Sequence, residues 1–289
     1  MARSLEETIK DSESRGVAVG HFNISDLVGL KAILTAVRNL NVPVIIGVSE
    51  GERNFVGLRE IAVLIKVLKE EFGLPIFLNA DHTHSLEGVE EVAKAGYDAV
   101  LFDSSQLPLD ENIRMTAEAV LRAKTLNSEI LVEGEIGYIG SSSKILKELP
   151  KGAVLEEKDL PKSEEAAEFV KETGIDLLAP AVGNIHGMLA NIPNPRLNIK
   201  RLREIRQVVK VPLVLHGGSG TADDDFRTAV KAGISVIHIN TELRVAWRRG
   251  VESGLKKNRE EVAPYKILPM AVEAVREVVE KRLKLFNGL

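Results

Sequence analysis

The segment Pro75-Ile76-Phe77-Leu78-Asn79-Ala80-Asp81-His82-Thr83-His84 decides the fold that we predict for this chain. It begins as a short apolar run, typical of a buried strand, and then places a carboxylate beside an imidazole. Two later segments change in the same way: residues 211–215 run into His216, and residues 176–182 run into Gly183-Asn184-Ile185-His186. If the three strands share one sheet, three imidazoles lie at carboxyl ends of strands and converge on one point.

Short β-rich apolar runs alternate with amphipathic helical stretches along the chain, in eight units. The expected strands are residues 17–22, 43–49, 75–80, 99–103, 130–135, 177–182, 212–216 and 236–240. The expected helices are residues 25–39, 57–72, 86–95, 109–126, 164–173, 199–209 and 223–232. Apolar strands joined by helices indicate a parallel sheet covered on both faces, and eight units close into a (β/α)8 TIM barrel. A doubly wound open sheet is the alternative, but the glycine fingerprint that it needs does not follow Phe22-Asn23.

The composition limits the class of protein. A chain of 289 residues with 44% hydrophobic residues can form one large domain or two small ones, and a TIM barrel favours a single domain over residues 1–289. The absence of cysteine excludes disulfides and thiolate ligands. The net charge of −4 argues against nucleic-acid binding, and no apolar run is long enough for a membrane span. Residues 1–15 are polar and do not resemble a signal peptide, so we expect a cytoplasmic protein.

Two stretches break the rhythm of strands and helices. The connection over residues 136–162 is longer than most barrel loops, and its flexible, polar composition predicts a mobile lid at the carboxyl face of the barrel. An inert surface excursion is the alternative interpretation. After Pro264, the apolar spacing over residues 267–286 predicts an extra C-terminal helix that packs on the barrel or on a partner subunit.

A barrel would gather the polar residues at strand ends into one candidate site. These residues are Asn23, Ser49, Asp81, His82, Asp103, Glu133, Glu135, Asn184, His186, His216, His238 and Asn240. A lone histidine at a strand end is usually a hydrogen-bonded core residue, but His82, His186 and His216 together match the ligands of a catalytic zinc site. None of the eight expected strands contains a lysine, so a Schiff-base nucleophile is missing and carbanion chemistry would depend on a metal.

The glycine-rich motif Gly217-Gly218-Ser219-Gly220 follows the seventh expected strand, where many barrels bind phosphate. Glycines let backbone N–H groups approach a ligand closely, and a helix is expected to begin after Thr221, so the loop is a candidate phosphate cradle. An ordinary turn is the alternative. Ser49 and Thr241 offer hydroxyl groups from neighbouring strand ends, although lone residues of this kind are more often helix caps.

Together these motifs resemble the class II, metal-dependent fructose-bisphosphate and tagatose-bisphosphate aldolase family. The resemblance covers nearly the whole chain, through Val19-Gly20-His21-Phe22-Asn23, Val48-Ser49-Glu50-Gly51, Asp81-His82, Phe102-Asp103-Ser104-Ser105, Val132-Glu133-Gly134-Glu135-Ile136-Gly137, Gly183-Asn184-Ile185-His186-Gly187, Leu215-His216-Gly217-Gly218-Ser219-Gly220 and Asn240-Thr241-Glu242-Leu243. It implies a TIM-barrel lyase of glycolysis and gluconeogenesis. Its expected reaction is the reversible cleavage of a ketose 1,6-bisphosphate, first of all fructose 1,6-bisphosphate, to dihydroxyacetone phosphate and glyceraldehyde 3-phosphate.

The resemblance also implies roles for individual residues. His82, His186 and His216 would bind the catalytic zinc ion, with Glu135 as a ligand in a more buried position. Asp81 would take the proton of the C4 hydroxyl as the carbon–carbon bond breaks, with a purely structural partner of an imidazole as the alternative. The residues expected to hold the substrate and its phosphate are Asn23, Ser49, Gly187, Gly217, Gly218, Ser219, Asn240 and Thr241. A monovalent cation, Na⁺ or K⁺, is expected beside that phosphate.

The sequence departs from the family pattern near the reacting carbons. His238 stands where the family usually has an asparagine that contacts the enediolate, and an imidazole can donate the same hydrogen bond. The lid carries Ser141-Ser142-Ser143 where the family has a glutamate that moves the proton at C3. We take Glu148 as the candidate catalytic substitute for that glutamate.

A third departure concerns the far phosphate of the substrate. Tyr265 stands where many members have an arginine that clamps this phosphate, often from a neighbouring subunit, and Lys266 or Arg276 is a candidate replacement. We expect a homodimer or homotetramer. Two alternatives therefore stay open: an aldolase for tagatose 1,6-bisphosphate or another ketose phosphate, and a barrel that binds a sugar phosphate without turnover.

Overall fold

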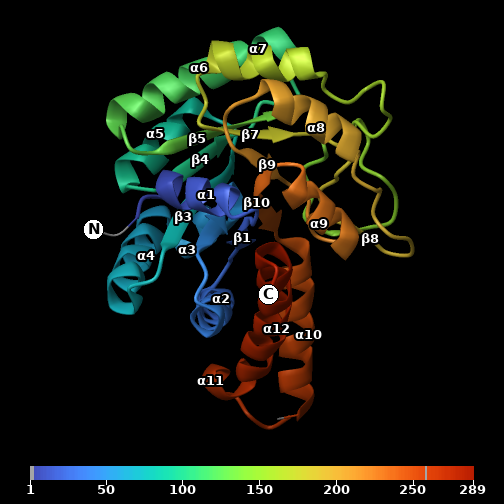
Figure 1. Ribbon diagram of the computed structural model, residues 1–289. Helices are drawn as coiled ribbons and strands as arrows, with labels where there is room; N and C mark the ends of the chain where they lie inside the picture. Colours follow the sequence, from blue (N-terminus) through green and yellow to red (C-terminus); the bar gives the residue numbers. More distant parts are fainter. Residues whose placement is uncertain (1–2, 258) are drawn as a thin grey trace.

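The computed structural model describes residues 3–257 and 259–289, and its centre is a closed barrel of eight parallel strands (Figure 1). The barrel strands are β1 (Val19–Asn23), β2 (Val44–Val48), β3 (Ile76–Thr83), β4 (Ala99–Phe102), β5 (Leu131–Ile136), β7 (Leu177–Pro180), β9 (Leu213–Leu215) and β10 (Ile234–Ile239). β1 pairs with β10 and closes the barrel, so the predicted TIM barrel is confirmed and the open sheet is excluded. Each expected strand is present.

Helices surround the barrel (Figure 1). Those that the sequence predicted are α2 (Leu27–Leu40), α4 (Leu58–Phe72), α5 (Leu86–Ala95), α6 (Leu109–Leu126), α7 (Ser163–Thr173), α8 (Ile199–Val208) and α9 (Asp223–Lys231). Those that it missed are α1 (Leu5–Ser14), α3 (Glu50–Val56) and α10 (Thr241–Lys257). The first two are short, and α10 contains two glycines, which disfavour a helix. Tertiary packing explains one of these two glycines, since a Cβ atom on Gly250 would lie 2.3 Å from the Cα atom of Ala271.

The predicted C-terminal helix is present as α12 (Pro269–Asn287), preceded by the short α11 (Pro264–Ile267). α12 packs against α10 and α2, and α10 and α12 run side by side away from the barrel with α11 at their far end (Figure 1). Near the barrel, the ring of Phe286 is buried and lies 5.2 Å from the ring of Phe226 in α9. One end of α12 therefore belongs to the barrel of its own chain, whereas α11 lies away from it.

The barrel interior changes from apolar to polar along its axis. Its lower part is filled by apolar side chains from the strands and by Leu5 and Ile9 of α1. Above them lie buried polar side chains that contact one another, among them His21, Asn79 and His238. Branched apolar residues usually fill such interiors, so the polar part points to a site at the carboxyl ends of the strands.

The long connection between β5 and α7 lies at that end of the barrel. It contains β6 (Ile145–Leu146), which pairs in parallel with β8 (Met188–Leu189), the segment that follows His186. The carbonyl oxygen of Ser143 also accepts a hydrogen bond of 3.2 Å from Arg244 at the start of α10. The connection thus covers the carboxyl face as expected of a lid, and its mobility stays a prediction. Among the described residues, no helix has the length and apolar character needed to cross a bilayer.

Candidate active site

Four side chains from four separate segments meet at the carboxyl end of the barrel. They are His82 in β3, Glu135 in β5, His186 after β7 and His216 after β9, and their ligand atoms lie within 4.8 Å of one another. The ring centroid of His82 lies 4.7 Å from that of His186 and 5.1 Å from that of His216. The three predicted imidazoles therefore converge, and the carboxylate of Glu135 joins them.

The donor atoms of this cluster fit a divalent metal ion. The buried atoms Nε2 of His82, Nε2 of His186, Nδ1 of His216 and Oε2 of Glu135 have no hydrogen-bond partner among the described residues. Buried polar atoms are nearly always hydrogen-bonded, so four such atoms around one point are suited to the binding of a cation. Imidazole nitrogens with a carboxylate oxygen suit zinc, and they also suit cobalt or iron.

Two carboxylates orient the imidazoles from behind. Oδ2 of Asp103 lies 2.8 Å from Nδ1 of His82, and Oε1 of Glu133 lies 2.7 Å from Nε2 of His216. Each carboxylate accepts a hydrogen bond from the N–H group of the ring that it faces, which leaves the other nitrogen of that ring directed at the cluster. Asp103 and Glu133 thus decide which nitrogen each ring directs into the cluster.

A local irregularity in β3 allows two consecutive residues to face the same site. Successive side chains of a strand normally point to opposite faces. Here the pairing of β3 with β4 shifts between Ala80 and Thr83, and His82 has a φ of 41°. This left-handed conformation costs a residue other than glycine about 1–2 kcal/mol. As a result, Nε2 of His82 lies 3.9 Å from Oδ1 of Asp81 inside the site.

Burial and nearby carboxylates shift the pKa values of the ligand side chains. Burial on its own lowers the pKa of His82, but Asp81 and Asp103 raise it to about 10. Burial, with the nearby Asp103, raises the pKa of Glu135 to about 8. Burial lowers the pKa of His186 well below its ordinary value. Because metal ligands must be deprotonated, binding of an ion at neutral pH is coupled to the release of protons.

Asp81 lies beside the ligand cluster, and each oxygen of its carboxylate faces a polar side chain. Its Oδ2 accepts a hydrogen bond of 2.8 Å from Nδ2 of Asn23, and its Oδ1 lies 3.4 Å from Nδ1 of His238. Burial on its own raises the pKa of Asp81, but His82 and His238 lower it well below its ordinary value. Asp81 is therefore anionic at neutral pH and is suited to accept a proton from a bound hydroxyl.

A cavity next to Asp81 brings together most of the expected substrate-binding residues. It is lined by Asn23, Gly187, Gly217, Gly218, Ser219, Asn240 and Thr241, together with Asp81, Ser143, His186, His216 and His238. The hydroxyl of Ser219 accepts hydrogen bonds of 3.2 Å from the backbone N–H groups of Asn240 and Glu242, which ties the glycine loop to the start of α10. Backbone N–H groups beside the first turn of a helix suit a phosphate.

Two expected site residues lie in different surroundings. Ser49 is the N-cap residue of α3, and its backbone N–H and hydroxyl donate to Glu52 at 2.8 and 2.9 Å. It also lines a neighbouring cavity with Asp81 and His82, so a cap and a contact to substrate are both compatible with its position. Glu148 is exposed in the lid and does not line the cavities beside the described cluster. Its catalytic role stays a prediction that requires the lid to move.

The candidate anchors of the far phosphate do not reach the site of their own chain. Tyr265 and Lys266 belong to α11, at the end of the hairpin away from the barrel (Figure 1). Lys266 forms an ion pair of 2.8 Å with Glu261. Arg276 is paired with the carboxylates of Glu273 and Glu280. None of the three residues lines the cavities beside the ligand cluster.

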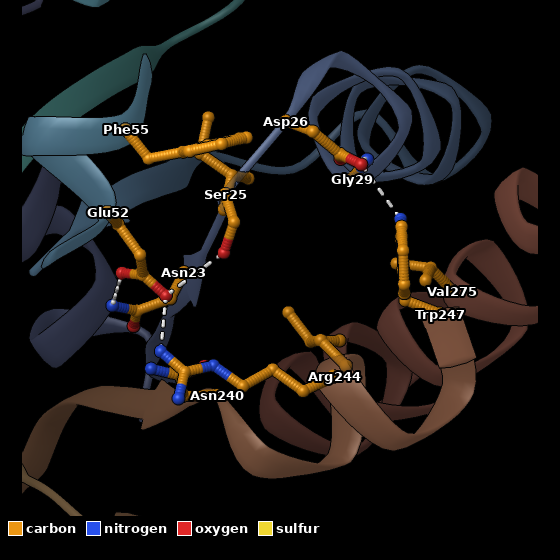
Figure 2. Close-up of a pocket in the computed structure, with 12 residues that line it drawn as sticks. Asn23, Ser25, Asp26, Gly29, Glu52, Phe55, Asn240, Arg244, Trp247 and Val275 are labelled. Carbon is orange, nitrogen blue, oxygen red and sulfur yellow. Dashed lines mark hydrogen bonds and ion pairs between the residues drawn. The ribbon is translucent and has the colours of Figure 1, made fainter. Parts of the chain in front are cut away.

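The structure adds polar residues that the sequence analysis did not assign to the site. Glu52 and Arg244 form an ion pair of 2.7 Å at the rim of the site, and Nδ2 of Asn23 donates to Glu52 at 2.8 Å (Figure 2). His21 and Asn79 lie below Asp81 inside the barrel. The spacing Ser49-x-x-Glu52 is a capping box that could have identified Glu52. The alternation of β1 places His21 on the same face as Asn23, but nothing in the sequence pairs Arg244 with Glu52.

Replacing Asp103 by asparagine is expected to weaken metal binding about tenfold to a hundredfold. The substitution removes the negative charge that faces His82, and asparagine has nearly the same shape as aspartate. Competition with a chelator, followed by elemental analysis, measures this affinity. Asp110→Asn removes an exposed carboxylate and serves as the matched control. Equal affinities of the two variants would show that Asp103 does not support a metal ligand.

Comparisons with known proteins agree with this geometry. The family model described as "Fructose-bisphosphate aldolase class-II" matches residues 3–288. The fructose-bisphosphate aldolase of Staphylococcus aureus is 35% identical over 98% of this chain and 96% of its own length. The crystal structure of the YdjI aldolase from Escherichia coli K12 is 29% identical with a TM-score of 0.82, and covers 99% of this chain and 97% of that one. Fructose-bisphosphate aldolase from Campylobacter jejuni, 21% identical over 99% of this chain and 95% of its own, shares the fold with a TM-score of 0.83. This chain therefore belongs to the class II fructose-bisphosphate aldolase family of metal-dependent lyases.

Proposed function

We propose that this protein is a zinc-dependent aldolase that reversibly cleaves fructose 1,6-bisphosphate to dihydroxyacetone phosphate and glyceraldehyde 3-phosphate. The observation that carries the proposal is the set of four buried ligand atoms without hydrogen-bond partners among the described residues, beside the anionic Asp81. The relative from Staphylococcus aureus, named fructose-bisphosphate aldolase, supports the same reaction.

The ligand cluster would hold the zinc ion. His82, His186 and His216 are its proposed ligands, and Glu135 is a ligand at a deeper position. When bound, zinc supplies a Lewis acid for the carbonyl group of the ketose. A monovalent cation, Na⁺ or K⁺, beside the phosphate belongs to the same proposal, with backbone carbonyl groups of residues 182–187 and Gly217 as its ligands.

The remaining residues bind the substrate and move protons. The glycine loop and the start of α10 hold the phosphate of the dihydroxyacetone phosphate half, through Gly187, Gly217, Gly218, Ser219 and Thr241. Asp81 accepts the proton of the C4 hydroxyl, and the imidazole of His238 donates a hydrogen bond to the substrate from the same cavity. Asn23, Ser49 and Asn240 complete the contacts to the sugar. Glu148 would exchange the proton at C3 once the lid closes.

The proposal also includes the cellular setting. An aldolase of this specificity serves glycolysis and gluconeogenesis, which places it in the cytoplasm. We propose a homodimer or homotetramer, because the outer end of the α10–α12 hairpin exposes apolar side chains of Leu255, Val262 and Tyr265, which are 50%, 87% and 75% exposed. Such a group of exposed apolar side chains is suited to a partner subunit.

Removal of the metal tests the central proposal. The purified enzyme is expected to cleave fructose 1,6-bisphosphate, to lose this activity after treatment with a chelator, and to regain it on addition of zinc. Elemental analysis before and after treatment reports the ion. Cleavage that continues at the same rate in metal-free protein would contradict the mechanism.

Asp81→Asn separates an aldolase from a barrel that only binds a sugar phosphate. Loss of the proton acceptor is expected to lower kcat about 10²-fold to 10⁴-fold. Binding of dihydroxyacetone phosphate, measured by calorimetry, is expected to persist because the phosphate cradle is intact. If the wild-type protein binds this ligand but turns over no ketose phosphate, the non-catalytic alternative holds.

A second candidate function differs in the aldehyde product. Arg244 lines the cavity above His82, but Glu52 balances its charge at 2.7 Å (Figure 2). A neighbouring cavity of about 360 Å³ is largely apolar, with Phe55 and Trp247 in its wall. A balanced cation beside an apolar cavity favours a ketose phosphate whose far end carries less charge than a phosphate group.

Arg244→Gln decides between the two substrates. If Arg244 binds the far phosphate, the variant is expected to raise KM for fructose 1,6-bisphosphate about tenfold, because a charge-assisted hydrogen bond is lost. KM for fructose 1-phosphate should change little. Arg248→Gln, one turn further along α10, removes an exposed arginine paired with Glu252 and is the control. Equal effects on both substrates would favour the second candidate, and a panel that includes tagatose 1,6-bisphosphate then identifies the preferred sugar.

A further inference from the structure

Two buried imidazoles lie face to face below the catalytic residues. His21 of β1 and His238 of β10 are register partners in the strand pair that closes the barrel. Their ring centroids are 3.5 Å apart and the ring planes differ by 4°. His21 is 0% exposed and does not belong to the cluster of His82, Glu135, His186 and His216, so the proposed chemistry leaves it without a role.

We propose that His21 is a positioning residue whose stacked ring fixes the imidazole of His238 beside Asp81. This inference rests on the proposed function, because that function makes Asp81 the proton acceptor. Asn23 holds one oxygen of Asp81 by a hydrogen bond, and His238 faces the other oxygen at 3.4 Å. The ring of His238 therefore limits the positions that this second oxygen of Asp81 can take.

The stack leaves the ring of His238 little freedom. His21 lies parallel to it, and the ring of His216 lies 3.9 Å from it at an angle of 39°. Both rings are buried, so the stack is enclosed by protein on its other sides.

His21 is itself held by its neighbours. Its Nε2 atom lies 3.1 Å from Nδ2 of Asn79, which donates to it. Gly47 in β2 provides the space for the ring, because a Cβ atom there would lie 2.1 Å from Cε1 of His21. Gly47 lacks the positive φ that demands glycine, so this contact explains the residue at that position.

A core filler would not need these features. Branched apolar side chains usually fill a barrel interior, and they leave no polar atom unsatisfied. Nδ1 of His21 is buried without a hydrogen-bond partner among the described residues, which costs stability. The stack accounts for an aromatic ring here, and the hydrogen bond from Asn79 accounts for its nitrogen, whereas filling of space alone explains neither.

Two substitutions of His21 separate stacking from hydrogen bonding. His21→Phe keeps a planar ring and loses both nitrogens, whereas His21→Gln keeps polar atoms and loses the ring. We expect His21→Gln to lower kcat for ketose phosphate cleavage about tenfold or more, with KM nearly unchanged, because a small displacement of a catalytic group has effects of this size. His21→Phe should retain most of kcat. The opposite order would overturn the proposal.

A double-mutant cycle tests whether His21 acts through His238. In a His238→Asn background there is no ring to position, so His21→Gln should have little further effect on kcat. If the two substitutions lower kcat independently, His21 acts elsewhere and the inference is wrong. Gly47→Ala supplies a second route, because it crowds the ring of His21: it should lower kcat in the wild-type background and much less when combined with His21→Ala.

Structural measurements test the role of His21 separately from the proposed aldolase activity. Thermal unfolding and bound metal should be close to wild type in each variant that is compared. A crystal structure of His21→Gln should show the ring of His238 displaced relative to Asp81, which can be tested whatever substrate the enzyme prefers. An unmoved ring would refute the inference about His21, whereas absence of turnover in the wild-type protein would refute only the proposed function.

Discussion

The candidate site depends on four buried side-chain atoms that are suited to bind a metal ion and have no hydrogen-bond partner within the described residues. Four such atoms converge at the carboxyl end of the barrel, and each would destabilise the fold in the absence of a ligand. The fold supports them with fixed carboxylates: Asp103 faces His82, and Glu133 faces His216. The arrangement is stable when a cation completes it, because ion binding contributes free energy to the folded state.

The barrel interior has an apolar part, which stabilises the fold, and a polar part, which forms the candidate site. The apolar lower part, closed by Leu5 and Ile9 of α1, provides hydrophobic stabilisation. In the polar part above it, Asn79 contacts His21 and the ring of His21 stacks on that of His238. A site supported on rigid strands keeps its geometry better than one built on loops alone.

Much of the architecture followed from local pattern. Alternating apolar runs and amphipathic stretches predicted every barrel strand, and the periodicity after Pro264 predicted α12. Helix α10 was missed because its two glycines disfavour a helix locally. Tertiary packing requires both, since a Cβ atom on Gly250 would lie 2.3 Å from the Cα atom of Ala271, and one on Gly254 would lie 2.2 Å from the carbonyl oxygen of Ile267. Ser49 illustrates a residue with two interpretations, since its hydroxyl takes part in a capping box and still borders the cavity.

The sequence by itself determined the barrel, and it placed His82, His186 and His216 at strand ends, because strand periodicity and chain order are local properties. Only the tertiary structure decided which ring nitrogens face the ion and how Asp81 comes to lie beside His82. The first depends on carboxylates from other strands, and the second on a register shift between β3 and β4. The stack of His21 on His238 and the ion pair of Arg244 with Glu52 exist only because closure brings β1 beside β10, and no local pattern reports a contact between the two ends of a chain.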